Sequence, residues 1–209
     1  MSIIIKQQRA YQKIDEIARK IKEGNLIIYP TETLYGLGCD AYNENAYLKI
    51  MNIKIRAKSK SMLILINSVQ MGLSLALDEN NLLEKVADKF WPGPLTVIVK
   101  AKDYIPKWLT DEKSKIAFRI SNNKFANALI DKLQSPLIST SANLSGTIPC
   151  RTISEAYFTF SDNVDIYIDA GTLSGAPSTI VDISQLPAKI MRNGAIPENI
   201  IRHKLPTLF

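Results

Sequence analysis

The sequence contains few of the residues on which covalent and metal chemistry usually depends. Its 209 residues include two cysteines, Cys39 and Cys150, and one histidine, His203. The cysteines lie far apart and form no CxxC pair, so we expect free thiols in a reducing compartment. No cysteine–histidine pair and no carboxylate cluster with the spacing of a dedicated metal cage is present. We therefore expect no metal site. The missing cysteine–histidine pair is not evidence against an enzyme, because positioning and charge neutralisation can supply most of a barrier reduction.

Long apolar runs are also missing. The first six residues are charged too early to be a signal peptide, and no run approaches the roughly 18 residues of a membrane span. We therefore expect a cytoplasmic protein without a membrane partner. The sequence also lacks GxGxxG and GxxxxGK[ST], so neither a Rossmann nor a Walker loop is expected to hold a nucleotide.

The composition is that of an ordinary globular protein, with 46% hydrophobic and 22% charged residues. The length suits one domain over residues 1–209, and no repeat, low-complexity tract or linker divides it. The net charge of +6 and the pI near 9.2 point to an anionic partner such as a nucleotide or RNA.

Hydroxyl and amide side chains crowd residues 139–146, which follow the short apolar run 136–138. The pattern predicts a buried strand that ends in a polar loop able to grip phosphate or a small polar substrate. The alternative is a Ser/Asn-rich turn that caps the next element.

A second polar segment, residues 31–38, follows the predicted strand 26–29 and carries two threonines, a carboxylate, a tyrosine and two glycines. At the end of a strand in an α/β sheet this is typical of a ligand loop. The alternative is a turn with both glycines at positive φ.

The densest positive charge lies in residues 54–60, between a helix that starts at Asn43 and the predicted strand 62–66. Charge runs are often solvated faces. Here the flanking elements hold the segment in place, as they do for cations that clamp phosphates.

The remaining pattern alternates helices and strands. Apolar spacing predicts helices over 14–21, 79–90 and from Asn122, and Thr152 with Glu155 predicts a capping box. Arg119 interrupts the predicted strand 116–120 and could be a surface residue. Further strands are predicted at 95–99, 164–168, 178–183 and 190–196, and Pro197 is expected to open a last helix.

Six blocks, in this order, resemble the YrdC/Sua5 family of threonylcarbamoyl-AMP synthases. They are residues 29–38 (YPTETLYGLG), Lys54-x-Arg56, residues 91–96 (WPGPLT), Ser141-x-Asn143 with Leu144, Ser145 and Gly146, residues 178–182 (STIVD), and Arg192-x-Gly194. The resemblance covers about residues 14–201 and suggests the short form, without an extra C-terminal domain.

The resemblance implies an α/β domain whose twisted mixed sheet and surrounding helices enclose a basic cavity. It also implies a reaction in which L-threonine, bicarbonate or CO2, and ATP with Mg2+ form L-threonylcarbamoyladenylate and pyrophosphate. The product would feed the t6A modification of tRNAs that read codons beginning with A. The implied partners are the downstream tRNA threonylcarbamoyl transferase machinery and, through a possible direct contact, tRNA. No bound prosthetic group is implied.

The family's motif positions imply roles for ten residues. The catalytic positions are Lys54, Arg56, Ser141 and Asn143; the L-threonine positions are Thr33, Arg119, Ser139 and Thr179; and the ATP positions are Arg56, Lys60, Ser141 and Arg192. Two departures from the family are Ala57 and Ser61, where prolines are usual. Because each proline would fix one φ, we expect a basic segment that moves more freely without ATP.

Two other interpretations are open at this stage. A basic surface with nearby aromatics could make the protein a non-catalytic double-stranded RNA- or tRNA-binding protein of the same fold, although basic and aromatic residues do not alternate along a strand. A carbamoyl-transferring domain is the other alternative, but such domains are normally fused to zinc fingers, and no C-x2-C is present.

Overall fold

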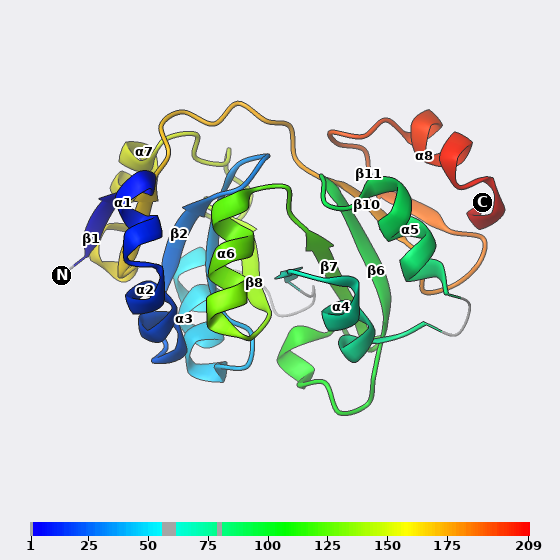
Figure 1. The fold of residues 1–209 in the computed structure, drawn as a ribbon, viewed down its shortest axis with the longest axis horizontal. Coiled ribbons are helices and arrows are strands. Elements are labelled where there is room, and N and C mark those ends of the chain that lie inside the picture. Colours follow the sequence, from blue (N-terminus) through cyan, green and yellow to red (C-terminus); the bar gives the residue numbers. More distant parts are fainter. Residues whose placement is uncertain (1, 56–61, 79–80) are drawn as a thin grey trace.

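The computed structural model describes residues 2–55, 62–78 and 81–209 of the chain. In these ranges, strands form a mixed sheet with helices packed around it (Figure 1). The strands are β1 (Ile3–Lys6), β2 (Ile27–Pro30), β3 (Tyr35–Asp40), β4 (Leu63–Ile66), β5 (Ala76–Leu77), β6 (Leu95–Ala101), β7 (Lys115–Ile120), β8 (Leu137–Ser141), β9 (Ile166–Asp169), β10 (Thr179–Asp182) and β11 (Lys189–Arg192). The helices are α1 (Gln7–Gln12), α2 (Ile14–Lys22), α3 (Glu44–Lys54), α4 (Val69–Leu75), α5 (Leu82–Phe90), α6 (Lys124–Leu133), α7 (Ile153–Phe160) and α8 (Glu198–Lys204), with 3-10 turns η1 (Lys107–Leu109), η2 (Ser161–Asn163) and η3 (Pro206–Leu208).

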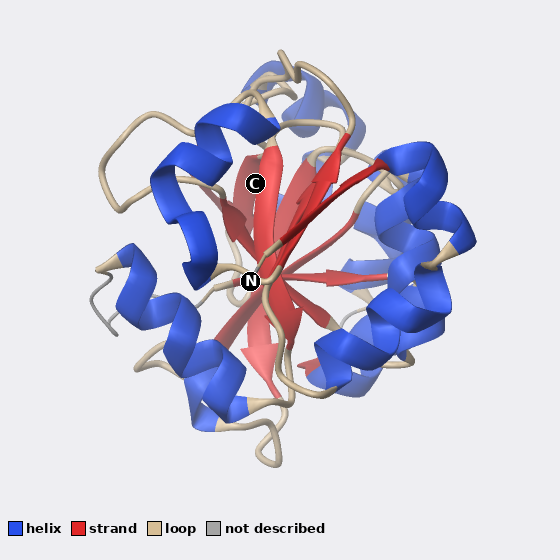
Figure 2. Ribbon diagram, turned by 90° about the vertical axis from the view of Figure 1, so that its left-hand side faces the viewer, coloured by secondary structure: helices blue, strands red, loops and turns tan. Residues whose placement is uncertain are grey.

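The sheet order is β1-β9-β2-β3-β8-β4-β7-β6-β10-β11, with β5 paired to β6. Parallel and antiparallel neighbours are mixed: β4 runs parallel to β7, for example, and antiparallel to β8. Seen along the sheet, the strands fan out and the helices surround them (Figure 2). This arrangement confirms the predicted twisted mixed α/β sheet.

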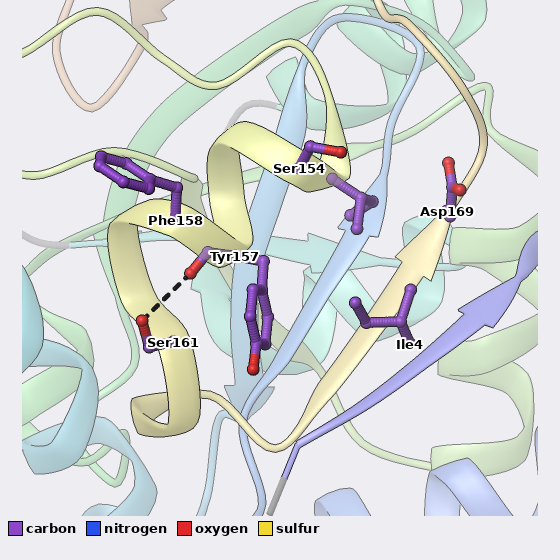
Figure 3. Close-up of a pocket in the computed structure, with 7 residues that line it drawn as sticks. Ile4, Ser154, Tyr157, Phe158, Ser161 and Asp169 are labelled. Carbon is purple, nitrogen blue, oxygen red and sulfur yellow. Dashed lines mark hydrogen bonds between the residues drawn. The ribbon is translucent and has the colours of Figure 1, made fainter.

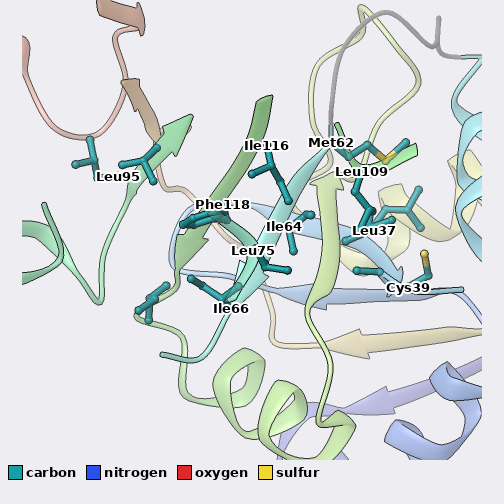
Figure 4. Packing of buried hydrophobic residues seen from close by; sticks show 14 of the residues in the cluster. Leu37, Cys39, Met62, Ile64, Ile66, Leu75, Leu95, Leu109, Ile116 and Phe118 are labelled. Carbon is teal, nitrogen blue, oxygen red and sulfur yellow. The ribbon is translucent and has the colours of Figure 1, made fainter. Parts of the chain in front are cut away.

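The central strands are buried on both faces. Along β4, Ile64 and Ile66 pack into the larger apolar cluster, while Leu65 belongs to a second cluster with residues of α2 and α6. Figure 4 shows part of the larger cluster, in which Ile64 and Ile66 lie near Phe118 of β7. Because alternate strand residues face opposite sides of the sheet, the side chains on the face of Leu65 lie on the other side of the sheet from Ile64 and Ile66.

Several sequence predictions about helices and cysteines are confirmed. Asn43 caps α3, with its side chain accepting a hydrogen bond from the Ala46 amide, and Thr152 and Glu155 form a capping box at α7. Cys39 and Cys150 are free and buried. The sequence patterns did not predict the strands β1, β3 and β5 or the helices α1 and α4. Among the described residues, every helix is too short or too polar to cross a membrane.

The expected polar loops are shorter than the sequence suggested. Gly36 and Gly38 lie within β3 and do not have positive φ, so the turn interpretation was wrong. A Cβ at Gly38 would lie 2.3 Å from the Ile138 carbonyl oxygen, which explains glycine there by close strand approach. Likewise Ser139 and Ser141 belong to β8, and the loop begins at Ala142.

Candidate active site

Polar side chains from neighbouring strands gather on the face of the sheet to which Leu65 belongs. Leu65 pairs with Arg119 on β7 and with Leu137 on β8, and Ser139 lies two residues beyond Leu137. Thr96 of β6 shares this face, because its neighbour Val97 pairs with Phe118 on the other face. Strand alternation therefore places Ser139, Arg119 and Thr96 in an oblique row on one face of the sheet, with Ser139 displaced by two residues from the level of Leu65 and Arg119.

Ser178 and Arg192 extend this row to the edge of the sheet. The Ser178 hydroxyl lies 2.9 Å from the Thr96 hydroxyl. Arg192 donates hydrogen bonds from Nε and Nη2 to the Ser178 carbonyl oxygen, at 3.0 and 2.8 Å, and from Nη2 to the Ser178 hydroxyl at 3.0 Å. Ser178 thus fixes the orientation of Arg192. Ser178 was not among the site residues predicted from the sequence.

Among the predicted site residues that lie on described strands, Thr179 is the one that this face does not include. It follows Ser178 and, by strand alternation, points to the other side of the sheet. Its hydroxyl donates to the Ile196 carbonyl oxygen at 2.6 Å and accepts from the Ile196 amide at 3.0 Å. Thr179 therefore fastens the turn after β11. Because side chains alternate between the two faces of a strand, the sequence pattern could have indicated Ser178, rather than Thr179, as the residue on the face of Thr96.

Arg119 is deeply buried, so its interpretation as a surface residue was wrong. Its side chain is 3% exposed, and its Nη1 lies 3.4 Å from Oε1 of Glu32. Its Nε and the same Glu32 oxygen are buried without a hydrogen-bond partner. Burial lowers the pKa of the Arg119 guanidinium, while Glu32 and Tyr29 oppose this effect. A buried guanidinium with an unused donor is suited to a carboxylate ligand.

The segment after β2 places Thr33 close to Arg119's partner Glu32. The Thr31 hydroxyl donates to the Leu34 carbonyl oxygen at 2.6 Å and lies 2.9 Å from the Thr33 hydroxyl. Thr33 is 6% exposed. The chain between β9 and β10 crosses this segment at Gly175, where a Cβ would lie 2.4 Å from the Thr33 carbonyl oxygen. The Thr31–Thr33 turn is therefore fixed from both sides.

Lys54, Ser141 and Asn143 form a second polar cluster at the end of β8. The buried Lys54 ammonium donates to the carbonyl oxygens of Ser141 and Asn143, each at 2.6 Å, and to the Asn143 side-chain oxygen at 3.3 Å. Ser141 donates to that same oxygen at 2.5 Å, and Asn143 donates to the backbone oxygens of Leu144 and Thr147. The predicted site residues Arg56 and Lys60 lie outside the described residues.

The charges on this face are mainly positive. Burial and the positive charge of Arg119 both lower the pKa of Arg192, so the two guanidinium groups are near enough to repel each other. Within the described ranges, no three histidine, cysteine, aspartate or glutamate side chains are grouped so that they could bind a metal ion. The face is thus suited to anions, which relieve the repulsion between its cations.

A pocket on the opposite edge of the sheet has different chemistry. Its volume is about 530 Å3, and it lies between β1 and α7, where Ile4, Tyr157 and Phe158 line it (Figure 3). Its charged side chain, Asp169, is already paired with Lys6 at 2.5 Å. This pocket offers a mostly apolar wall rather than cations for an anionic ligand.

Comparison with known proteins identifies the family of the chain. The Sua5/YciO/YrdC family model, described as telomere recombination, matches residues 19–194. A Pyrococcus abyssi protein named threonylcarbamoyl-AMP synthase is 33% identical over 94% of this chain and 59% of its own length. A Pseudoalteromonas translucida protein of the same name is 37% identical over 78% of this chain and 88% of its own length.

A solved structure of a relative has the same fold as this chain. The crystal structure of P. abyssi Sua5 complexed with L-threonine superposes with a TM-score of 0.91 at 30% identity, covering 98% of this chain and 61% of that one. The chain spans less than two thirds of the length of the P. abyssi proteins it matches. The chain belongs to the Sua5/YciO/YrdC family.

Proposed function

We propose that this chain is an L-threonylcarbamoyladenylate synthase, which joins L-threonine, bicarbonate or CO2, and ATP and releases pyrophosphate. Two relatives that are 33% and 37% identical to it over the aligned residues carry the name threonylcarbamoyl-AMP synthase. These names favour the catalytic interpretation over a non-catalytic RNA-binding protein of the same fold.

The observation that carries the proposal is the buried Arg119 guanidinium, which has an unused donor and lies next to Glu32. We propose that Arg119 holds the threonine carboxylate by a bidentate pair, a geometry that a guanidinium fork favours. Thr33 and Ser139 are suited to the polar remainder of the substrate. Thr179 would support the site from the opposite face of the sheet, because its hydroxyl donates a hydrogen bond to the Ile196 carbonyl oxygen.

ATP would bind at the cationic end of the same face. Arg192, Arg56 and Lys60 are proposed for its phosphates. Ser141 and Asn143 would face the reacting carboxyl group, and Lys54 would hold them in place while its charge favours the anionic substrate. Mg2+ would enter with the triphosphate, whose oxygens are good ligands for this ion.

The chemistry requires positioning more than covalent catalysis. The threonine ammonium loses a proton, and its nitrogen forms a bond to the carbon of CO2 or bicarbonate. The nitrogen gives up a second proton in this step, to solvent when CO2 reacts and to the departing hydroxide, forming water, when bicarbonate reacts. A carbamate oxygen then attacks the α-phosphorus, and the bond to the β,γ-pyrophosphate breaks. Two anions must approach each other in the second step, so fixed cations lower its barrier.

The product would be used in t6A formation on tRNAs that read codons beginning with A. A mixed anhydride of a carbamate and a phosphate is reactive toward amines, so an enzyme that transfers the threonylcarbamoyl group to tRNA must follow. We propose that the chain works as one domain over residues 1–209. Direct contact with tRNA and a cytoplasmic location remain part of this proposal.

Pyrophosphate release tests the function. Purified protein with ATP and Mg2+ should release pyrophosphate only when both L-threonine and bicarbonate are added. Release without them, or no release at all, would contradict the proposed reaction.

A further inference from the structure

Glu32 is the acidic side chain that faces Arg119, and its geometry is unusual. The Glu32 Oε1 to Arg119 Nη1 distance is 3.4 Å, whereas charge-assisted hydrogen bonds of this type are about 2.7–2.9 Å. Glu32 Oε1 and Arg119 Nε are both buried without a hydrogen-bond partner. The pair is therefore close enough to interact electrostatically but leaves part of each group's bonding capacity unused.

A buried serine sets the orientation of Glu32. Ser121, which is 0% exposed, donates a short hydrogen bond to Glu32 Oε2. The Ser121 hydroxyl also accepts a hydrogen bond from the Asn123 amide at 3.1 Å, and Asn127 donates to the Ser121 carbonyl oxygen at 2.8 Å. The start of α6 thus fixes Ser121, and Ser121 directs the other Glu32 oxygen toward Arg119.

We propose that Glu32 is a positioning residue that holds the Arg119 guanidinium in the orientation that receives the carboxylate of the amino-acid substrate. This inference rests on the proposed function for the identity of the substrate. Arg119 is buried and is repelled by Arg192, so without an acidic neighbour its charge would be uncompensated. Glu32 supplies that charge from 3.4 Å, which leaves the guanidinium donors for the ligand.

A different role for Glu32 would give different kinetics. If Glu32 accepted the proton of the threonine ammonium, Glu32→Gln would lower kcat and leave the threonine KM unchanged. A positioning residue changes the threonine KM most, because the misoriented guanidinium weakens substrate binding before the chemical steps.

The test compares two ligands by calorimetry with the full chain: L-threonine, which has the carboxylate, and L-threonine amide, which lacks it. Glu32→Gln should weaken L-threonine binding by about tenfold or more, the effect of losing roughly one charge-assisted contact, and leave amide binding unchanged. Glu32→Asp should restore part of the loss, and Ser121→Ala should show a smaller loss of the same kind. The control is Glu23→Gln, which removes an exposed carboxylate paired with Arg19 at 2.9 Å. This variant should bind both ligands with the affinity of the wild type.

Each result has a clear meaning. The positioning role would be overturned if Glu32→Gln weakened the binding of both ligands equally or of neither. It would also be overturned if Glu32→Gln lowered kcat at a constant threonine KM. If the wild type binds threonine with the predicted Glu32 dependence but releases no pyrophosphate, the proposed reaction fails and the positioning role stands. If the wild type does not bind threonine, both are overturned.

Discussion

Two buried cations in this site are used in opposite ways. Lys54 donates to three oxygens of Ser141 and Asn143, all of them within the protein. Arg119 retains an unused donor and has its acidic neighbour at a distance. At the residue scale, therefore, Lys54 shapes the polar loop, while Arg119 is the group available to a ligand carboxylate.

Replacing Lys54 tests this division of roles. Lys54→Met takes the ammonium donor away from the Asn143 carbonyl oxygen and from the Ser141 carbonyl oxygen, which keeps a hydrogen bond from the Asn143 amide at 2.9 Å. We therefore expect the free energy of unfolding to fall by about 1–3 kcal/mol. Adenylate formation should also be lost, and both effects can be measured by urea denaturation and pyrophosphate release.

Lys49→Met is the matched control on the same helix. Lys49 also donates to a backbone oxygen, that of Gly24 at 2.9 Å, but it is exposed and lies outside the site. Its replacement should change stability by less than about 0.5 kcal/mol and leave activity intact. Normal turnover by Lys54→Met would remove Lys54 from the account.

At the scale of elements, an ion pair joins β10 to β7 across the intervening β6. Lys115 Nζ lies 2.7 Å from Asp182 Oδ2, and both side chains are largely buried. Ser184 also donates to the Asp182 carboxylate, at 2.6 Å. This pair holds the strand that leads from Ser178 against the strand that carries Arg119, and so supports the spacing of the site.

The ion pair predicts a dependence of stability on pH. Burial alone raises the pKa of Asp182, but the hydrogen bonds from Lys115 and Ser184 outweigh it, so the pKa lies below its ordinary value of 3.8. A carboxyl whose pKa is lower in the folded state stabilises the fold above pH 3.8, and this contribution is lost as the pH falls below that value.

Asp182→Asn should therefore lower Tm at pH 7 and make the fall in Tm below about pH 4 less steep. The control is Asp103→Asn, an exposed aspartate in the loop after β6. Parallel Tm profiles for the wild type and Asp182→Asn would mean that the ion pair does not stabilise the fold.

The chain between β9 and β10 runs along the top of the sheet in Figure 1, and its Gly175 packs closely against the Thr33 segment. A Cβ at Gly175 would lie 2.4 Å from the Thr33 carbonyl oxygen and 2.8 Å from that of Glu32. Gly175→Ala should push this segment away from Arg119, raise the threonine KM and lower Tm.

Gly171→Ala is the comparison for this change. Gly171 lies in the same crossing chain, and a Cβ there meets nothing within 4 Å, although its φ of +82° makes alanine cost about 1 kcal/mol. We expect a lower Tm with an unchanged threonine KM. Equal KM values for the two variants would show that the crossing chain does not control the site.

At the scale of the whole molecule, the charge of +6 is compatible with both a nucleotide substrate and RNA. The two ligands differ in salt dependence. Threonine binding to a buried site should change by less than about threefold between 50 and 200 mM salt, because buried pairs are weakly screened. RNA held through several phosphates would lose affinity by orders of magnitude over this range. Titrations at both salt concentrations distinguish the two.

Local patterns predicted most helices, strands and caps, because spacing, capping residues and prolines act within a few neighbours. The site depended on contacts between distant residues. Ser121 donates a hydrogen bond to Glu32, which lies 89 positions away in the sequence. The need for glycine at position 38 follows only from the close approach of β8, where a Cβ would meet the Ile138 carbonyl oxygen. The family motifs indicated Lys54, Asn143 and Arg119 as proposed site residues. Ser178 joined the proposed site only through the strand pairing, and Glu32 only through its contacts with Ser121 and Arg119.

The most direct test of the account is the identity of the product. The wild-type protein should be incubated with ATP, Mg2+, L-threonine and isotopically labelled bicarbonate, and the products separated and weighed by mass spectrometry. We predict an AMP adduct that contains one threonine and the labelled carbon. An AMP adduct without the label, or ATP recovered unchanged in the presence of both small substrates, would contradict the proposed synthesis.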